Sequence, residues 1–131
     1  MSEDLTILEL EKMVQDFTDS REDVQGQIIM SYPSGVPVAN SWKGEMNPIL
    51  IGAISAAVKL NFQNLCNNLK KGNLDRILIN NENGKIIVQN AGPTAILTTI
   101  MTYDADLYTA AFMTLNIAKK VEKLLKNYEF D

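Results

Sequence analysis

The chain has 131 residues and a mass of 14.6 kDa, which is enough for one domain and too little for two. Hydrophobic residues make up 46% and charged residues 21%, as in an ordinary globular protein rather than a disordered one. Twelve basic and sixteen acidic side chains give a net charge of −4, without the positive excess typical of nucleic-acid binding. We therefore expect one folded unit over residues 1–131 that does not bind nucleic acid.

The sequence contains no His and a single cysteine, Cys66, which we expect to be a half-buried structural thiol. Ser-His-Asp and Cys-His nucleophilic systems, His-ligated zinc and multi-thiolate metal sites therefore cannot be built from one chain. The glycines form neither of the phosphate-binding patterns G-x-x-x-x-G-K-[ST] and G-x-G-x-x-G. We expect no catalytic residue, no cofactor, no metal site and no enzymatic activity.

The first residues, MSEDLTILELEK, alternate acidic with apolar side chains, unlike the basic and apolar regions of a secretory signal. No run of about 18 uninterrupted apolar residues is present to span a bilayer. These features predict a cytoplasmic protein without membrane insertion.

The segment from Glu3 to Thr18 predicts an amphipathic helix, because its apolar residues recur about once per helical turn. The polar run from Asp19 to Asp23 would end it. We expect one buried stripe on this helix, formed by Leu5, Leu8, Leu10, Met13, Val14 and Phe17.

Two short apolar runs follow, Val24–Ser31 and Val36–Ser41. They flank the tetrapeptide Tyr32-Pro33-Ser34-Gly35, an arrangement typical of a β-hairpin. Pro37 in the second run cannot donate a hydrogen bond to a neighbouring strand, so we expect this strand at an edge of the sheet.

A second helix is expected to start at Asn47-Pro48, because Asn can cap free amides and Pro is preset for the first helical position. It should run to about Lys71 and end at Gly72 in a left-handed conformation.

Apolar residues cover more than about two-thirds of the circumference of this second helix, whereas packing on one sheet needs an arc of only about 100°. The polar strip is confined to Gly52, Lys59, Gln63 and Lys70. We favour one side packing on the sheet and another on a second protein, and a fully buried core helix is the alternative. The bulkier side is assigned to the sheet: Ile51, Ile54, Val58, Phe62, Leu65 and Leu69. The flatter side is assigned to the partner: Leu50, Ala53, Ala57, Leu60, Asn61 and Asn64.

A second hairpin is predicted from Asn73–Asn81 and Lys85–Asn90, because Asn83-Gly84 between them is the strongest two-residue turn signal. A turn at this pair of residues would place Ile79 opposite Val88. Both faces of this ribbon are apolar, so helices must cover the sheet on both sides.

The remaining elements are a strand over Thr94–Thr102 and a helix from Asp104 to Lys126. Asp104 and Asp106 are read as helix caps rather than metal ligands, and the lysines near the end of the helix as a solvated face. We expect Tyr108 and Ala111 on its inner side, together with Leu115, Ala118 and Leu125. The order is α-β-β-α-β-β-β-α, with mostly antiparallel strands.

The hairpin VQGQIIMSYPSGVPVANS, with Gly26, Gly35, Pro37 and Ala39, resembles the opening of Roadblock/dynein light chain domains. The Ala-rich helix GAISAAVKLNFQNL, the ribbon LDRILINNENGKIIVQNAGPTAIL and the closing helix continue the likeness over nearly the whole chain. The resemblance implies an α+β fold, an α/β/α sandwich around a five-stranded antiparallel sheet. Helix two would lie on one face and helices one and three on the other.

Family members dimerise by packing helix two on its mate and by pairing the third strand edge to edge. The resemblance therefore implies a homodimer here, with this interface: Leu50, Ala53, Ala57, Leu60, Asn61, Asn64, Arg76 and Leu78. Within the family, gliding-motility polarity regulators accelerate hydrolysis on small Ras-like GTPases and lysosomal scaffold subunits dock them. Dynein light chains instead bind motor intermediate chains.

The implied function is a non-enzymatic platform that binds and regulates a small GTPase. A light-chain or adaptor subunit of a larger assembly is the alternative, and a small-molecule sensor domain is a weaker one. Arg21 and Arg76 are the only arginines that could serve as an arginine finger. Because Arg76 lies in the expected dimer strand and Arg21 in an exposed loop, we expect any acceleration to act by ordering the GTPase's own switch segments.

Overall fold

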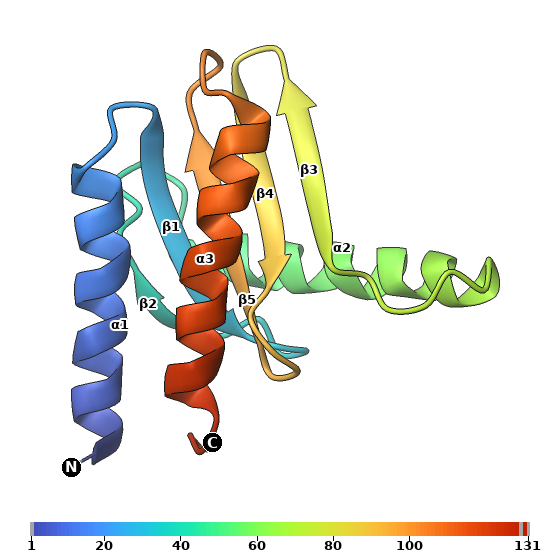
Figure 1. Cartoon of the computed structure of the whole chain (residues 1–131), viewed down its shortest axis with the longest axis horizontal. Helices are drawn as coiled ribbons and strands as arrows, with labels where there is room; N and C mark the ends of the chain where they lie inside the picture. Colours follow the sequence, from blue (N-terminus) through green and yellow to red (C-terminus); the bar gives the residue numbers. More distant parts are fainter. Residues whose placement is uncertain (1, 129, 131) are drawn as a thin grey trace.

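The computed structural model describes residues 2–128 and 130, which form three layers (Figure 1). Helices α1 (Ser2–Asp19) and α3 (Leu107–Leu125) lie side by side on one face of the sheet, and α2 (Pro48–Asn68) crosses the other face. The antiparallel strands follow the order β2-β1-β5-β4-β3. Their bounds are Val24–Ser31 for β1, Pro37–Asn40 for β2, Arg76–Asn81 for β3, Gly84–Asn90 for β4 and Ala95–Met101 for β5. The predicted five-stranded sandwich is confirmed, and β2 lies at an edge as Pro37 indicated.

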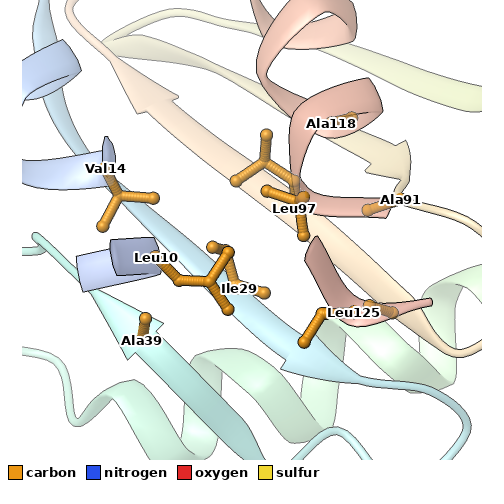
Figure 2. Packing of buried hydrophobic residues seen from close by; sticks show 10 residues of the cluster. Leu10, Val14, Ile29, Ala39, Ala91, Leu97, Ala118 and Leu125 are labelled. Carbon is orange, nitrogen blue, oxygen red and sulfur yellow. The ribbon is translucent and has the colours of Figure 1, made fainter. Parts of the chain in front are cut away.

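The core between the sheet and helices α1 and α3 is formed by aliphatic side chains (Figure 2). Leu10 and Val14 of α1 reach Ile29 of β1, and Leu97 of β5 lies beside α3. The predicted stripe on α1 was too wide, because Leu5 and Leu8 are 65% and 60% exposed. At 100° per residue they lie about 140° and 160° around the helix from Leu10, so one sheet cannot bury both sides.

Helix α2 begins as predicted, with the Asn47 side chain accepting a hydrogen bond from the Ile49 amide at 2.9 Å. It ends at Asn68, three residues before the expected Lys71. Lys70 takes the left-handed conformation with φ 58°, and the Lys71 amide bonds the Cys66 carbonyl at 2.8 Å. The helix therefore closes before Gly72 is reached.

The β3–β4 hairpin has a different register from the predicted one. The turn residues are Glu82 and Asn83, so Ile79 pairs with Ile86 rather than with Val88. Gly84 begins β4, where an added Cβ would lie 2.8 Å from the Met101 carbonyl oxygen. Close approach of β5, rather than a turn with positive φ, therefore requires this glycine. The pairing shifts by two residues, which leaves every side chain on its predicted face.

Helix α3 starts at Leu107, three residues later than expected, and Asp106 caps it. Its carboxylate accepts from the Tyr108 amide at 3.1 Å and from the Thr109 hydroxyl at 2.9 Å, and the bonds from Thr109 lower the pKa of Asp106. Ala111 faces inward as predicted, but Tyr108 points to solvent. Leu107, one residue earlier, packs against the core, so Tyr108 lies about 100° around the helix from the inward side.

Candidate functional site

The side of α2 that packs on the rest of the chain includes Gly52 and Lys59, two residues of the strip that the sequence marked as polar. Its buried residues are Ile51, Gly52, Ser55, Ala56 and Lys59. Of the six bulky residues assigned to the sheet, Ile51 alone is buried, so that assignment was wrong. Hydrophobicity pointed to the wider apolar arc, whereas the contact is set by small residues that let the helix approach closely.

Gly52 shows why the helix turns this side inward. A Cβ added at Gly52 would overlap the carbonyl oxygen of Gly35 in the β1–β2 turn, so only glycine permits this approach. Ser55 accepts a hydrogen bond from the Thr98 hydroxyl at 3.2 Å. The Lys59 ammonium lies 3.5 Å from the centre of the Tyr32 ring, and burial lowers the pKa of Lys59. Gly52, Ser55 and Lys59 thus each contact another part of the chain.

Because α2 turns its small and polar residues inward, it leaves an apolar face exposed. Seven large side chains of this helix and its C-cap are between 43% and 67% exposed: Ile49, Leu50, Ile54, Leu60, Phe62, Leu65 and Leu69. We call these seven residues the apolar face of α2. The C-terminal part of the helix also extends past β3, the last strand of the sheet (Figure 1). A monomer therefore leaves this helix largely uncovered.

The residues predicted to form the interface are accessible in the single chain. On α2 the exposed members are Leu50, Ala53, Ala57, Leu60, Asn61 and Asn64. On β3, which has no neighbouring strand on its outer side, Arg76 is exposed and Leu78 is 36% exposed. The structure thus places both segments at the surface, and their role as an interface stays a prediction.

An apolar groove between α2 and the sheet was not predicted. It has a volume of about 280 Å³ and is lined by Ile54 and Val58 of α2 and by Ile79, Ile86 and Ile100 of the sheet. Trp42 and Met46 also line it, and the Trp42 indole donates a hydrogen bond to the Met46 carbonyl at 3.0 Å. One sequence signal could have indicated this groove: the β3–β4 hairpin is apolar on both faces. The groove lies where α2 covers one of these faces only in part.

Neither arginine presents a free guanidinium group. Arg21 donates to both carboxylate oxygens of Asp23, at 3.0 and 2.9 Å, and to the Met113 sulfur at 3.1 Å. It is therefore half-buried, and the expectation of an exposed loop residue was wrong. Arg76 bonds Asp75 at 2.7 Å and the Gln89 side chain at 3.1 Å.

Two further sequence expectations concern cation and membrane binding. Within residues 2–128 and 130, no three Cys, Asp or Glu side chains are grouped so that they could hold a metal ion. Helix α2 has 21 residues and a mean hydropathy of 1.3, so by length and composition alone it could cross a membrane. Packed helices of soluble proteins also meet this measure, and the absence of membrane insertion stays a prediction.

No protein-family model matches the sequence, and no curated protein matches it by sequence. Solved structures do match. A Roadblock/LC7 domain from Streptomyces avermitilis superposes with a TM-score of 0.81 at 11% identity, over 89% of this chain and 98% of that one. MglB from Myxococcus xanthus gives 0.84 at 7% identity, over 95% and 93%. The gliding protein MglB from Thermus thermophilus gives 0.75 at 14% identity, over 92% and 89%.

This chain has the Roadblock/LC7 fold. The resemblance drawn from its glycines, alanines and element order is confirmed for the fold. Each superposition covers nearly all of this chain and of the compared chain. In Roadblock terms, the exposed apolar helix is helix two and the free edge is the third strand.

Proposed function

We propose that this Roadblock-fold chain is a homodimeric, non-enzymatic, cytoplasmic platform that binds and regulates a small Ras-like GTPase. The observation that carries the proposal is the uncovered apolar face of α2 beside the free edge of β3. The fold alone does not determine function, so the argument rests on this surface and on the implied behaviour of the family.

The apolar face of α2 supplies part of the free energy that a dimer needs. Full burial of a large apolar side chain contributes about 1.5–3 kcal/mol, so covering each half-exposed one contributes about 1 kcal/mol. The contributions of both copies act against an estimated association cost of about 4–15 kcal/mol. Pairing of two β3 edges would add backbone hydrogen bonds.

Small residues favour helix-to-helix contact in this dimer. Ala53 and Ala57 are one turn apart and exposed, so two α2 helices can approach closely there. Asn61 continues the same stripe, and its amide can both donate and accept across a two-fold axis. We infer that this stripe crosses its copy and that Leu50 and Leu60 flank the crossing.

A GTPase would bind the composite surface made by the two α2 helices and the adjoining strand ends. One asymmetric GTPase across the two-fold axis would exclude a second, giving two chains per GTPase, whereas binding away from the axis would give one per chain. Since Arg21 and Arg76 are both tied to neighbouring carboxylates, we propose that regulation acts through the switch segments of the GTPase.

The test is nucleotide-dependent capture from the native source. The purified chain is incubated with extract containing either a non-hydrolysable GTP analogue or GDP, and bound proteins are identified by mass spectrometry. We expect a small GTPase that is enriched with one nucleotide and lost with the Leu60→Asp chain. Equal capture in both nucleotide states, or capture of a large assembly without a GTPase, would favour the adaptor alternative.

A further inference from the structure

A polar pocket of about 530 Å³ lies at the end of the sheet, outside the apolar face of α2 and the apolar groove. It is enclosed by α2, the connection from α2 to β3, the β4–β5 turn and α3. The polar residues that line it include Lys59, Gln63, Asn73, Gln89, Asn90 and Lys119. With β4, which contributes Gln89 and Asn90, five segments therefore converge on one hollow.

Lys59 is the unusual residue of this pocket, because the residue as a whole is 7% exposed and yet carries a charge. Within the part of the chain that the structure describes, no carboxylate or hydrogen-bond acceptor contacts its ammonium, which rests on the Tyr32 ring. An ammonium has three N–H donors, and the face of an aromatic ring satisfies none of them fully. Lys59 therefore has unused donors at the pocket wall.

The neighbouring amides act as a frame rather than as ligands. Gln63 accepts from the Leu74 amide at 2.8 Å and donates to the Gly72 carbonyl at 3.2 Å. Gln89 donates to the Asp75 carbonyl at 3.1 Å, and Asn90 donates to the Leu74 carbonyl at 2.5 Å. These bonds fix the α2–β3 connection against β4, so the pocket has a built wall.

The charges around the pocket favour an anion. Asp75 is paired with Arg76 at 2.7 Å, which leaves Glu122 as the other carboxylate of the lining. Lys59 of α2 and Lys119 of α3 both line the pocket. A second hollow shares Pro93 and Glu122 with this pocket, and its lining adds Lys123 and Lys126. Positive charge thus gathers here in a chain whose net charge is −4.

We propose that this pocket binds a small oxyanion, the carboxylate or phosphate group of a soluble molecule, between Lys59 and Lys119. Lys59 supplies an unpaired ammonium on a buried stem, whose charge the anion neutralises, and Lys119 supplies an exposed ammonium from α3. The inference is independent of the proposed GTPase platform, since it concerns a different surface and is tested on the purified chain alone.

The experiment titrates the ¹⁵N-labelled full chain with inorganic phosphate, and separately with succinate, at constant ionic strength set by chloride. We expect saturable amide shifts confined to Asn73, Asn90 and Gly92, and the anion that saturates at the lower concentration identifies the source of the group. Lys59→Met should weaken binding at least about tenfold. Lys43→Met, which removes an exposed lysine paired with Asp19, should leave it unchanged.

Lys119→Met serves as the second variant, because this exposed residue can be replaced without disturbing the fold. It should weaken binding several-fold even where Lys59→Met is poorly folded. The proposal is overturned by linear shifts spread over all lysine-bearing surfaces with both anions, or by saturable binding that is unaffected in Lys119→Met and in folded Lys59→Met.

Discussion

Replacing Gly52 by Ala tests whether α2 turns its small, polar side to the sheet. On an exposed helix this change stabilises by about 1 kcal/mol, because Ala is the better helix former. At Gly52 the new Cβ would overlap the Gly35 carbonyl oxygen, which belongs to the backbone and cannot rotate away. Overpacking of this kind costs about 1–3 kcal/mol, so we expect a net loss of up to about 2 kcal/mol.

The assay is urea unfolding of wild type and Gly52→Ala, followed by far-UV circular dichroism at one protein concentration. Gly72→Ala is the control, because Gly72 has φ 87° and no atom near an added Cβ. That control should cost about 1 kcal/mol through backbone strain alone. A Gly52→Ala chain that is more stable than wild type would show that α2 does not lie against the β1–β2 turn.

Three further predictions concern single side chains. Arg21→Ala should leave any stimulation of GTP hydrolysis within a few-fold of wild type in single-turnover assays, whereas loss of on the order of 10³-fold would identify an arginine finger. Burial lowers the pKa of Lys59, so between that value and the ordinary 10.5 the unfolded chain holds the proton more tightly and stability should rise with pH. The rise should be missing in Lys59→Met, and an equal slope of stability against pH in the two chains just below pH 10.5 would contradict it. Asp106→Ala should lower the urea midpoint of unfolding, because α3 loses its cap, and an unchanged midpoint would show the cap to be dispensable.

The sequence was most informative where a local rule determines structure. Asn47-Pro48 marked the start of α2, Pro37 marked an edge strand, and two short apolar runs marked the first hairpin. The register of the second hairpin could not be predicted in the same way. Gly84 was read as a turn residue, whereas contact with Met101 of β5 determines its place, and that neighbour is set by the whole sheet.

The orientation of α2 was the main failure, and its cause is physical. Hydropathy measures how much a side chain gains from burial, but not how closely two backbones can approach. Gly52 and Ser55 permit a close contact, and Lys59 can bury its stem while its charge rests on Tyr32. The excess of apolar surface was correctly anticipated, whereas the direction in which it points depended on tertiary contacts.

The central claim is that a second copy of this chain covers the apolar face of α2. Sedimentation equilibrium of the purified chain at about 50 µM tests it most directly, and we expect twice the chain mass of 14.6 kDa. Leu60→Asp should give the mass of one chain, because an unpaired carboxylate in a buried interface costs about 3–5 kcal/mol and symmetry places it there twice. Leu8→Asp, a matched change on the exposed side of α1, should remain a dimer. A wild-type chain that sediments as a monomer at this concentration, or a Leu60→Asp chain that stays a dimer, would contradict the account.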